Sequence, residues 1–498
     1  MNTTTYRNIT ILVLITLLIF YPLFLTHFGY SDEILQLWLN HHGPSFTMFT
    51  PQGRFLTDVI TIISFKSIHS IDELNWLRLV SLLGWIVCLP LWYGIFNRVC
   101  RKESLSGLLP FLSVCYLITS PPFCVSVFWT SCMELFLANT AGLVAGYMVY
   151  AALIDPGVSV RRRGIILAAG CVAGLISLFT YQSGYPCFLL PFLLHFLSSR
   201  RITRLLAAGL LAYLLLYVVY YLLFRWQLHV LGISPDARTS LNSNIIAKLY
   251  FFLTRPLAGA FHFTWLADYT GKIGVAVSAL LLMGFMGWNL RKTPSSSFRQ
   301  RVVFVAGILL FFLLLYIPGL MARENYASNR TMFSLDMGVF AFAAVTLLQA
   351  IKQEWSRRIW VIGATVFFVA CACYNLRIQF LKPIRTEYET VRKEMEAHYQ
   401  PGVTTGISFI RPPDDLFQRM YHTTPSWDEF GRPSTYPEWV PVYFVRQVIL
   451  EKTGNLSAAN SVPVQVLQPG SVIPVDMASG KKNVVIDVQK LLLNKNIF

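Results

Sequence analysis

Charged residues are scarce in this sequence. Only 13% of its 498 residues are Asp, Glu, Lys or Arg, whereas 55% are apolar. Soluble proteins usually carry about 25% charged residues, so an ordinary soluble enzyme is excluded. A disordered chain is excluded as well, because disorder requires low hydrophobicity and a high net charge. The composition therefore predicts an integral membrane protein.

Motifs of several common sites are also absent. The nine cysteines lie between Cys88 and Cys373, mostly inside apolar runs, and no pair has Cys-x-x-Cys spacing. They indicate neither a disulfide framework nor a zinc site. The nine histidines form no His-Glu-x-x-His pattern, and the sequence has no glycine-rich phosphate loop or dinucleotide fingerprint. ATP hydrolysis and a soluble nucleotide cofactor are therefore not expected.

The formal net charge of +16 is concentrated in the hydrophobic part of the chain. Residues 1–377 hold 28 of the 41 Lys and Arg residues but only 13 of the 25 Asp and Glu residues. The cations form short clusters between apolar runs, which is a signal of membrane topology. No basic groove-binding helix or aromatic-basic platform is present in the sequence, so we expect no nucleic-acid partner.

Apolar runs predict about eleven transmembrane helices. These runs cover residues 9–28, 76–96, 107–129, 133–154, 164–180, 185–199, 204–226, 272–290, 302–321, 333–351 and 359–377. The basic clusters follow alternate runs, so they share one side, which the positive-inside rule assigns to the cytoplasm. The N-terminus is then cytoplasmic and the C-terminus lies outside. No small-residue cleavage site follows the first run, so we expect an uncleaved helix.

The least regular pair of runs is 164–180 and 185–199. Pro186 and Pro191 interrupt the second run, and the pair together is barely long enough for two crossings. A re-entrant hairpin is the alternative, and it would place Gln182 midway through the membrane. The C-terminus lies on the same side in both cases.

Three stretches outside the predicted membrane are long enough to fold, namely 29–75, 227–271 and 378–498. An apolar run at 55–65 is too short to span, so it predicts an amphipathic helix in the membrane interface. A second such element is expected around 249–265.

The tail differs in character from the rest of the chain. It opens with a charged helical pattern at 386–398 and ends with short Val-rich runs at 464–467 and 484–488, which are typical of strands. The expected fold is an all-α polytopic membrane domain at 1–377, followed by a small α+β domain at 378–498.

Two adjacent carboxylates, Asp32 and Glu33, follow the first apolar run. Carboxylates are costly to hold close to lipid, so this pair indicates a functional role. One of them could act as a general base on a hydroxyl nucleophile, while the other hydrogen-bonds the acceptor. The alternative is that Ser31 and Asp32 simply begin a helix as its N-cap.

The same loop contains Gln52-Gly53-Arg54 and Asp58. The planar guanidinium of Arg54 could hold a phosphate through two parallel N–H donors. Alternatively, Arg54 is an interfacial anchor whose charged end reaches the lipid headgroups.

Two further outer motifs carry polar side chains. Thr180 to Tyr185 includes Tyr181 and Gln182, whose aromatic face and amide suit a sugar, although a simple turn with Gly and Ser is the alternative. Arg323 and Arg330 lie on the predicted outer side of the membrane, where the positive-inside rule predicts few cations. Two cations there suit a lipid phosphate. Salt bridges from these arginines to Glu324 or Asp336 are the other interpretation.

Together these residues resemble the GT-C class of polytopic glycosyltransferases. The resemblance covers most of residues 1–377 and rests on Tyr30-Ser31-Asp32-Glu33, on Gln52-Gly53-Arg54, and on Tyr181-Gln182. Within that class, the layout is similar to the Gtr serotype-converting glucosyltransferases of bacterial O-antigen modification. The tail agrees only in gross layout.

The resemblance implies an enzyme of the bacterial inner membrane with a periplasmic C-terminus. It would move a sugar, expected to be glucose, from polyprenyl (undecaprenyl) phosphate to an O-antigen repeat of lipopolysaccharide by an inverting single displacement. Members commonly have an acidic pair here, and the second acid is Glu in this chain, which leaves open which of the two is the base. The expected residues are Asp32 and Glu33 for catalysis, Arg54, Arg323 and Arg330 for the donor phosphate, and Asp58, Tyr181, Gln182, Glu324 and Asn325 for substrate contacts.

The expected partners are membrane lipid, a lipid-linked polysaccharide acceptor, a small flippase and a glycosyltransferase that loads the carrier. No cofactor is expected, and a need for a divalent metal is left open. One alternative is a flippase or transporter of lipid-linked saccharides, which would require polar residues near the bilayer midplane and paired repeats. An O-antigen polymerase, or a receptor that uses the tail to bind a ligand, are the others.

Overall fold

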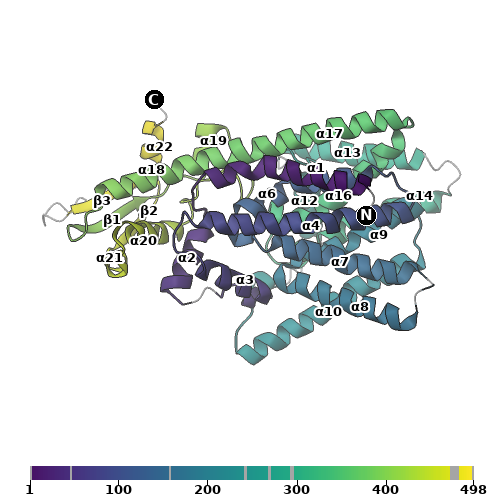
Figure 1. The fold of residues 1–498 in the computed structure, drawn as a ribbon, viewed down its shortest axis with the longest axis horizontal. Helices are drawn as coiled ribbons and strands as arrows, with labels where there is room; N and C mark the ends of the chain where they lie inside the picture. The colour runs from purple at the N-terminus through teal and green to yellow at the C-terminus, as the bar shows by residue number, and fades with distance from the viewer. Residues whose placement is uncertain are drawn as a thin grey trace.

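Long helices packed side by side make up most of the protein (Figure 1). The computed structural model describes residues 3–44, 47–155, 157, 159–240, 244–266, 271–291, 297–471 and 482–495. The expected outer stretches 29–75 and 227–271 therefore lie partly outside the described residues. The predicted all-α polytopic fold with a small α+β tail is confirmed.

Within those ranges, nine helices are long and apolar enough to cross a membrane. They are α1 with its 3-10 extension (Thr3–Leu25), α4 (Leu74–Lys102), α7 with the 3-10 turn before it (Thr130–Ile154), α8 (Val160–Thr180), α10 (Arg204–Leu231), α13 (Lys272–Arg291), α14 (Phe298–Leu315), α16 (Asn329–Ala350) and the continuous helix Glu354–His398. A tenth span arises if α5 (Leu109–Thr119) and α6 (Pro121–Phe128), bent by 49°, form one crossing. The bend follows from Pro121 and Pro122, which cannot donate to the preceding helical turn.

The run predicted as a span at 185–199 is built differently. It starts as a 3-10 helix, η4 (Gln182–Leu189), and continues as the short helix α9 (Leu190–Ser199). At the far end of α9, His195 lies 2.9 Å from Glu103, which directly follows α4. The chain therefore passes through the bundle twice, as α8 and as η4–α9, and Gln182 lies at the end of the bundle that carries the first outer loop.

A continuous helix of 45 residues joins the bundle to the tail (Figure 1). It consists of α17 (Glu354–Tyr374), a π-helical stretch (Asn375–Leu381) and α18 (Lys382–His398). The domain boundary predicted between 377 and 378 falls within the π-helical stretch. Gln379 in that stretch accepts a hydrogen bond from the backbone N–H of Thr424 at 2.7 Å, so the helix also supports the tail.

The tail contains a three-stranded parallel sheet with the order β2-β1-β3. The predicted strands are confirmed as β2 (Val464–Leu467) and β3 (Lys482–Asp487). The central strand, β1 (Thr404–Ile410), was missed, since Gly406 breaks the apolar alternation on which strand prediction depends. The helices α19 (Leu416–Tyr421), α20 (Val440–Thr453), α21 (Leu456–Ser461) and α22 (Val488–Lys495) complete the tail.

The first outer loop folds into two helices at the same end of the bundle as the tail (Figure 1). These are α2 (Asp32–His42) and α3 (Phe55–Lys66), which confirms the helix predicted at 55–65. The element predicted around 249–265 is divided into α11 (Ile245–Thr254) and α12 (Pro256–Ala260), because Pro256 starts a new helix. The tail and the first loop therefore meet over the same end of the helical bundle.

Candidate functional site

Asp32 is the first residue of α2, and its carboxylate is only partly buried. Its Oδ1 accepts a hydrogen bond from Nε1 of Trp439 in the tail at 2.9 Å, while Oδ2 accepts none from the described residues. Burial raises the pKa of Asp32 above its ordinary value; the Trp439 hydrogen bond and the guanidiniums of Arg330 and Arg238 oppose that rise. Asp32 is thus a carboxylate with a strengthened affinity for a proton and one oxygen available to a ligand.

The neighbouring carboxylate of Glu33 is fully buried, and neither of its oxygens is left for a ligand. Its Oε2 accepts hydrogen bonds from Arg78 at 2.6 Å and from the backbone N–H of Tyr30 at 2.8 Å. Its Oε1 accepts one from the backbone N–H of Thr130 at 2.6 Å. Arg78 is itself fully buried in α4. The adjacent acids therefore differ: Glu33 ties the first loop to α4, and Asp32 faces outward.

The backbone just before Asp32 is strained. Ser31 has a φ of 48°, in the left-handed region that residues other than glycine rarely adopt. It occupies the N-cap position of α2, but its side chain makes no capping hydrogen bond. Instead, its N–H donates to Oγ of Ser434 at 2.8 Å, and that hydroxyl donates to the carbonyl of Gly29 at 3.2 Å. Such a conformation persists only where its surroundings fix it, as the tail does here.

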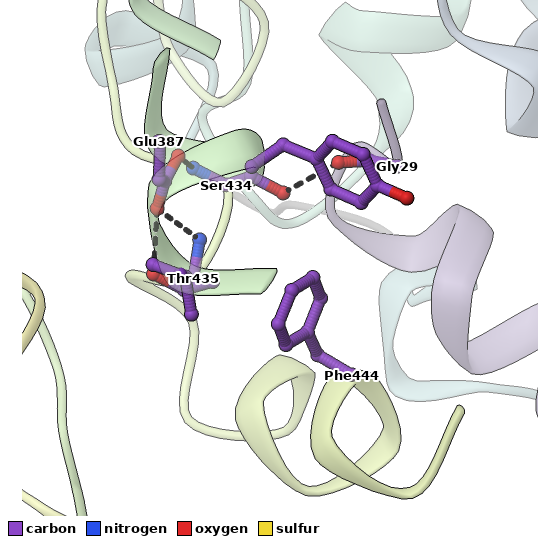
Figure 2. Close-up of a pocket in the computed structure, with 7 residues that line it drawn as sticks. Gly29, Glu387, Ser434, Thr435 and Phe444 are labelled. Atoms are coloured by element: carbon purple, nitrogen blue, oxygen red, sulfur yellow. Dashed lines mark hydrogen bonds between the residues drawn. The ribbon is translucent and has the colours of Figure 1, made fainter. Parts of the chain in front are cut away.

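Glu387 in α18 holds Ser434 in place. Its carboxylate accepts hydrogen bonds from the backbone N–H groups of Ser434 at 2.7 Å and Thr435 at 3.0 Å, and from the Thr435 hydroxyl at 2.6 Å (Figure 2). These residues line a small hollow beside Gly29. A chain of hydrogen bonds thus runs from the long helix through the tail to the backbone that presents Asp32.

Arg330 lies in the first turn of α16 and points toward the tail. Its guanidinium donates hydrogen bonds to Oδ2 of Asp428 at 2.9 Å and to the hydroxyl of Tyr326 at 2.5 Å. Burial acts to raise the pKa of Asp428, but Arg330 and Tyr326 hold it below its ordinary value. The salt bridge expected for Arg330 therefore exists, with a partner from the tail in place of Glu324 or Asp336.

Glu429, next to Asp428, caps the start of α16. It is fully buried and accepts hydrogen bonds from the backbone N–H groups of Asn329 at 2.7 Å and Arg330 at 3.1 Å. A carboxylate at this position also interacts favourably with the helix dipole. We call the pair Asp428 and Glu429 the tail clasp, because it holds the tail against α16.

Arg54 immediately precedes α3; its hydrogen-bond and stacking partners are neutral, and it interacts with the carboxylates of Asp58 and Glu134 only through longer-range electrostatics. Its guanidinium donates a hydrogen bond to Oε1 of Gln52 and lies over the rings of Phe49 and Tyr181, at 5.1 and 4.9 Å from their centroids. No carboxylate in the described part of the chain forms an ion pair with it. Its charge is therefore available to an anion, in contrast to the charge of Arg330.

The turn that carries Arg54 is fixed by residues from two other helices. Nε2 of Gln182 donates to the carbonyl of Gln52 at 2.8 Å and to the hydroxyl of Tyr220 at 2.7 Å, and that hydroxyl donates to the carbonyl of Gly53 at 3.0 Å. Asp58 holds the start of the same turn, because it accepts hydrogen bonds from the backbone of residues 49 and 50 at 3.0 and 2.5 Å. Gln182 and Asp58, both expected to contact substrate, thus hold the loop in place.

We expect Gly53→Ala to destabilise this turn. Gly53 has a φ of 81°, and a Cβ there would lie 2.1 Å from the hydroxyl of Tyr220. Backbone strain of this kind costs about 1–3 kcal/mol, so the variant should unfold at a lower temperature in detergent. Gly94→Ala in α4 is the control, since a Cβ there would meet nothing within 4 Å. Equal melting temperatures for the two variants would contradict the proposed tight packing.

Glu134 is the residue that sequence reasoning missed. It is only 2% exposed, at the start of α7, and it interacts electrostatically with both Arg54 and Arg330. Tyr181 interacts with the same two arginines. Guanidiniums from the first loop and from α16 therefore both act electrostatically on one buried carboxylate, and Arg330 acts on Asp32 as well. A signal did exist, because a carboxylate within a predicted span is costly without a role.

The other predicted residues lie elsewhere. Arg323, Glu324 and Asn325 are at the surface. The backbone N–H of Arg323 donates to the carbonyl of Ser240 at 2.8 Å, and the carbonyl of Glu324 accepts from Lys248 at 2.7 Å. This turn therefore packs against the second outer stretch. Among the described residues, no group of three or more His, Cys, Asp or Glu side chains is arranged to hold a metal ion.

Comparisons with known proteins add a structural likeness. No protein-family model matches the sequence, and no curated protein matches it. Among solved structures, the chain is similar to the archaeal oligosaccharyltransferase AglB from Archaeoglobus fulgidus, in complex with an inhibitory peptide and a dolichol-phosphate. The identity is 11%, the match covers 92% of this chain and 72% of that chain, and the TM-score is 0.43. At these values neither a residue role nor an activity is transferred from it.

Proposed function

We propose that this protein is a membrane glycosyltransferase that moves a sugar from a polyprenyl-phosphate donor to a hydroxyl group of a lipid-linked saccharide. The observation that carries the proposal is Asp32: a partly exposed carboxylate with one available oxygen, presented by strained backbone and influenced electrostatically by Arg330 and Arg238, which come from distant parts of the chain. The sequence resemblance supports glucose as the sugar and an O-antigen repeat as the acceptor.

In the proposed reaction, Asp32 acts as the general base. Oδ2 of Asp32 takes the proton of the acceptor hydroxyl, and the oxygen of that hydroxyl forms a bond to the anomeric carbon of the donor. The bond between that carbon and the phosphate oxygen breaks, and its electron pair leaves with the polyprenyl phosphate. A single displacement inverts the anomeric configuration. Polyprenyl phosphate leaves as a stable anion, so no general acid is required.

Arg54 is the proposed ligand of the donor phosphate. Its guanidinium has neutral partners, so a phosphate can bind to it without breaking an ion pair. Donors fixed around a leaving group stabilise the charge that develops on it. Arg330 is held by Asp428, so it could contact the phosphate only after Asp428 moves away. Tyr181 lies under Arg54 and supports its orientation.

The remaining predicted residues receive separate roles in this proposal. Glu33, Asp58 and Gln182 position the loop that carries Asp32 and Arg54. Arg323, Glu324 and Asn325 lie at the surface beside the second outer stretch, where they would meet the acceptor chain. We propose the bacterial inner membrane as the location, with this end periplasmic, because the positive-inside rule places the basic clusters in the cytoplasm. A flippase and a carrier-loading enzyme would supply the donor.

A transfer assay tests the proposed function. Purified protein would be given radiolabelled polyprenyl-phosphoryl glucose and a lipid-linked oligosaccharide, with and without a chelator of divalent cations. A labelled oligosaccharide product is the expected result. Movement of the donor across vesicle membranes without a new glycosidic bond would contradict the proposal and favour a flippase.

The acid limb of the pH profile should report the pKa of Asp32. Burial raises that pKa, so the base is protonated, and transfer is lost, at a pH above the usual range of an Asp, near 3.9. The Trp439 hydrogen bond favours the ionised form, so Trp439→Phe should move the limb of kcat/KM to still higher pH. Trp439 is 52% exposed, so the fold should tolerate the change. An unmoved limb in that variant would exclude Asp32 as the titrating group.

A further inference from the structure

Arg238 lies on a short 3-10 turn after α10, η5 (Ala237–Thr239), and is not among the residues that the sequence pattern indicated. Its side chain is exposed, and its guanidinium forms no ion pair with any carboxylate that the structure describes. It acts electrostatically on Asp32, as Arg330 does. Of these two cations, Arg330 is paired with Asp428, so Arg238 is the one whose charge is available to a ligand.

The turn that carries Arg238 is fixed against the first outer loop. The backbone N–H of Asp236 donates to the carbonyl of Pro51 at 3.0 Å, and Oδ2 of Asp236 accepts from Nε2 of Gln52 at 3.2 Å. Oδ1 of Asp236 accepts from the backbone N–H of Arg238 at 2.8 Å. On the other side, the carbonyl of Ser240 accepts a hydrogen bond at 2.8 Å from the backbone of the turn before α16. The turn is therefore held on two sides, and it sets the position from which Arg238 extends.

The side chain of Gln52 connects this turn to Arg54. It is only 4% exposed; its Oε1 accepts a hydrogen bond from Arg54, and its Nε2 donates to Asp236. One buried amide thus joins the segment of Arg54 to the segment of Arg238. Both guanidiniums lack an ion-pair partner among the described residues. Like charges on joined turns repel each other, so an anion that binds both would remove an unfavourable interaction.

The charge of the donor phosphate changes during the proposed transfer. A sugar phosphodiester of a polyprenyl carrier has one negative charge. When the bond to the anomeric carbon breaks, its electron pair stays on the phosphate, which then has two, while the proton of the acceptor hydroxyl moves to Asp32. Arg54 matches the first charge, and the second requires another cation. Because Arg330 is paired with Asp428, Arg238 is better placed to supply it.

We propose that Arg238 is the second guanidinium of the donor-phosphate site, where it and Arg54 together hold the phosphate of the departing carrier. The identity of the donor rests on the proposed function, but binding of a phosphate can be measured without transfer. In this arrangement, Arg54 binds the phosphate from the first loop and Arg238 binds it from the turn after α10, while Gln52 and Asp236 position both. Arg238 then contributes more to the rate than to the affinity for the donor.

Kinetics and phosphate binding on the full-length protein in a neutral detergent test this role. Arg238→Gln should lower kcat about tenfold or more, with a smaller change in KM for the donor, because the second charge exists only once the bond breaks. Polyprenyl phosphate, which carries both charges, should bind about tenfold more weakly, and uncharged polyprenol should bind as before. Arg238→Lys should retain part of both properties, since it keeps the charge. The matched control is Arg419→Gln, which removes an exposed arginine of the tail.

An unchanged kcat together with unchanged affinity for polyprenyl phosphate in Arg238→Gln would overturn the inference and leave the proposed function standing. The phosphate of a bilayer lipid has the same chemistry as the donor phosphate, so the assays would be repeated in nanodiscs of phosphatidylcholine with and without phosphatidylglycerol. An effect of Arg238→Gln only where phosphatidylglycerol is present would assign Arg238 to the lipid headgroups and overturn the inference too. If the wild-type protein transfers no sugar but binds polyprenyl phosphate through Arg238, the proposed function fails and the phosphate site is supported.

Discussion

Asp32→Asn is expected to abolish sugar transfer while the protein keeps its fold. A general base contributes roughly 10²–10⁴-fold to the rate, and an amide of the same shape cannot accept the proton. Burial raises the pKa of Asp32, which means that folding disfavours its charged form. The neutral amide should therefore melt at the same temperature or slightly higher. Transfer of labelled sugar and thermal unfolding in detergent measure the two outcomes.

The neighbouring substitution, Glu33→Gln, should instead lower the stability of the protein. All the groups around the Glu33 carboxylate are donors, namely the N–H groups of Arg78, Tyr30 and Thr130. An amide would place its own NH₂ against one of them and would leave Arg78 buried without a countercharge. Breaking a buried ion pair in this way costs about 3–5 kcal/mol.

Replacing both partners separates charge from packing. Glu33→Gln combined with Arg78→Met removes the unpaired charge, so it should recover part of the lost stability. If Glu33→Gln melts like the wild type and loses transfer, then Glu33 is the base and the roles of the two acids are reversed. The same assay and the same detergent serve for the variants of both acids.

The sequence could indicate the acidic pair but not the division of roles within it. Glu33 differs from Asp32 because of Arg78, which lies 45 residues away, and Thr130, which lies 97 residues away. A local sequence pattern cannot indicate contacts between residues so far apart in the chain. The one available signal was Arg78 itself, a charged residue inside a predicted span, where an unpaired guanidinium would be costly.

Most spans could be predicted because a run of apolar residues long enough to cross a bilayer is a local property. The differences occur where proline interrupts such a run, at Pro121 between α5 and α6 and at Pro186 in η4. Proline marks where a helix is interrupted, but the packing of the neighbouring helices determines which conformation the chain adopts there. In η4, for example, the backbone of Phe188 packs directly against Gly146 of α7. A Cβ at position 146 would lie 2.0 Å from the carbonyl oxygen of Phe188.

The contribution of the tail to the site could not be predicted. Trp439 is 407 residues from Asp32, and Asp428 is 98 residues from Arg330. Nothing in the local pattern of the tail indicates that its loops return to the first outer loop. The structure therefore changes the interpretation of Arg330, whose charge is already matched, and gives greater weight to Arg54.

Because the charge of Arg330 is matched and that of Arg54 is not, the second large effect is expected at Arg54. Arg54→Gln should lower the rate of transfer by roughly 10²–10³-fold, as loss of a donor to a developing oxyanion does. Its melting temperature should change little, because Arg54 hydrogen-bonds Gln52, stacks on two rings and acts on Glu134 and Asp58 only through longer-range electrostatics. Arg54→Lys should retain part of the rate, since it keeps the charge but loses the planar pair of donors.

Arg330→Gln is the matched control for charge removal, and it should act mainly on stability. It leaves Asp428 without its cation and weakens the tail clasp on α16, so the variant should melt at a lower temperature. Competition by polyprenyl phosphate gives the third measurement: its affinity should fall in Arg54→Gln more than in Arg330→Gln. If the phosphate binds equally well to Arg54→Gln and to the wild type, then Arg54 does not hold the donor. The guanidinium that does would then be one that Asp428 first has to release.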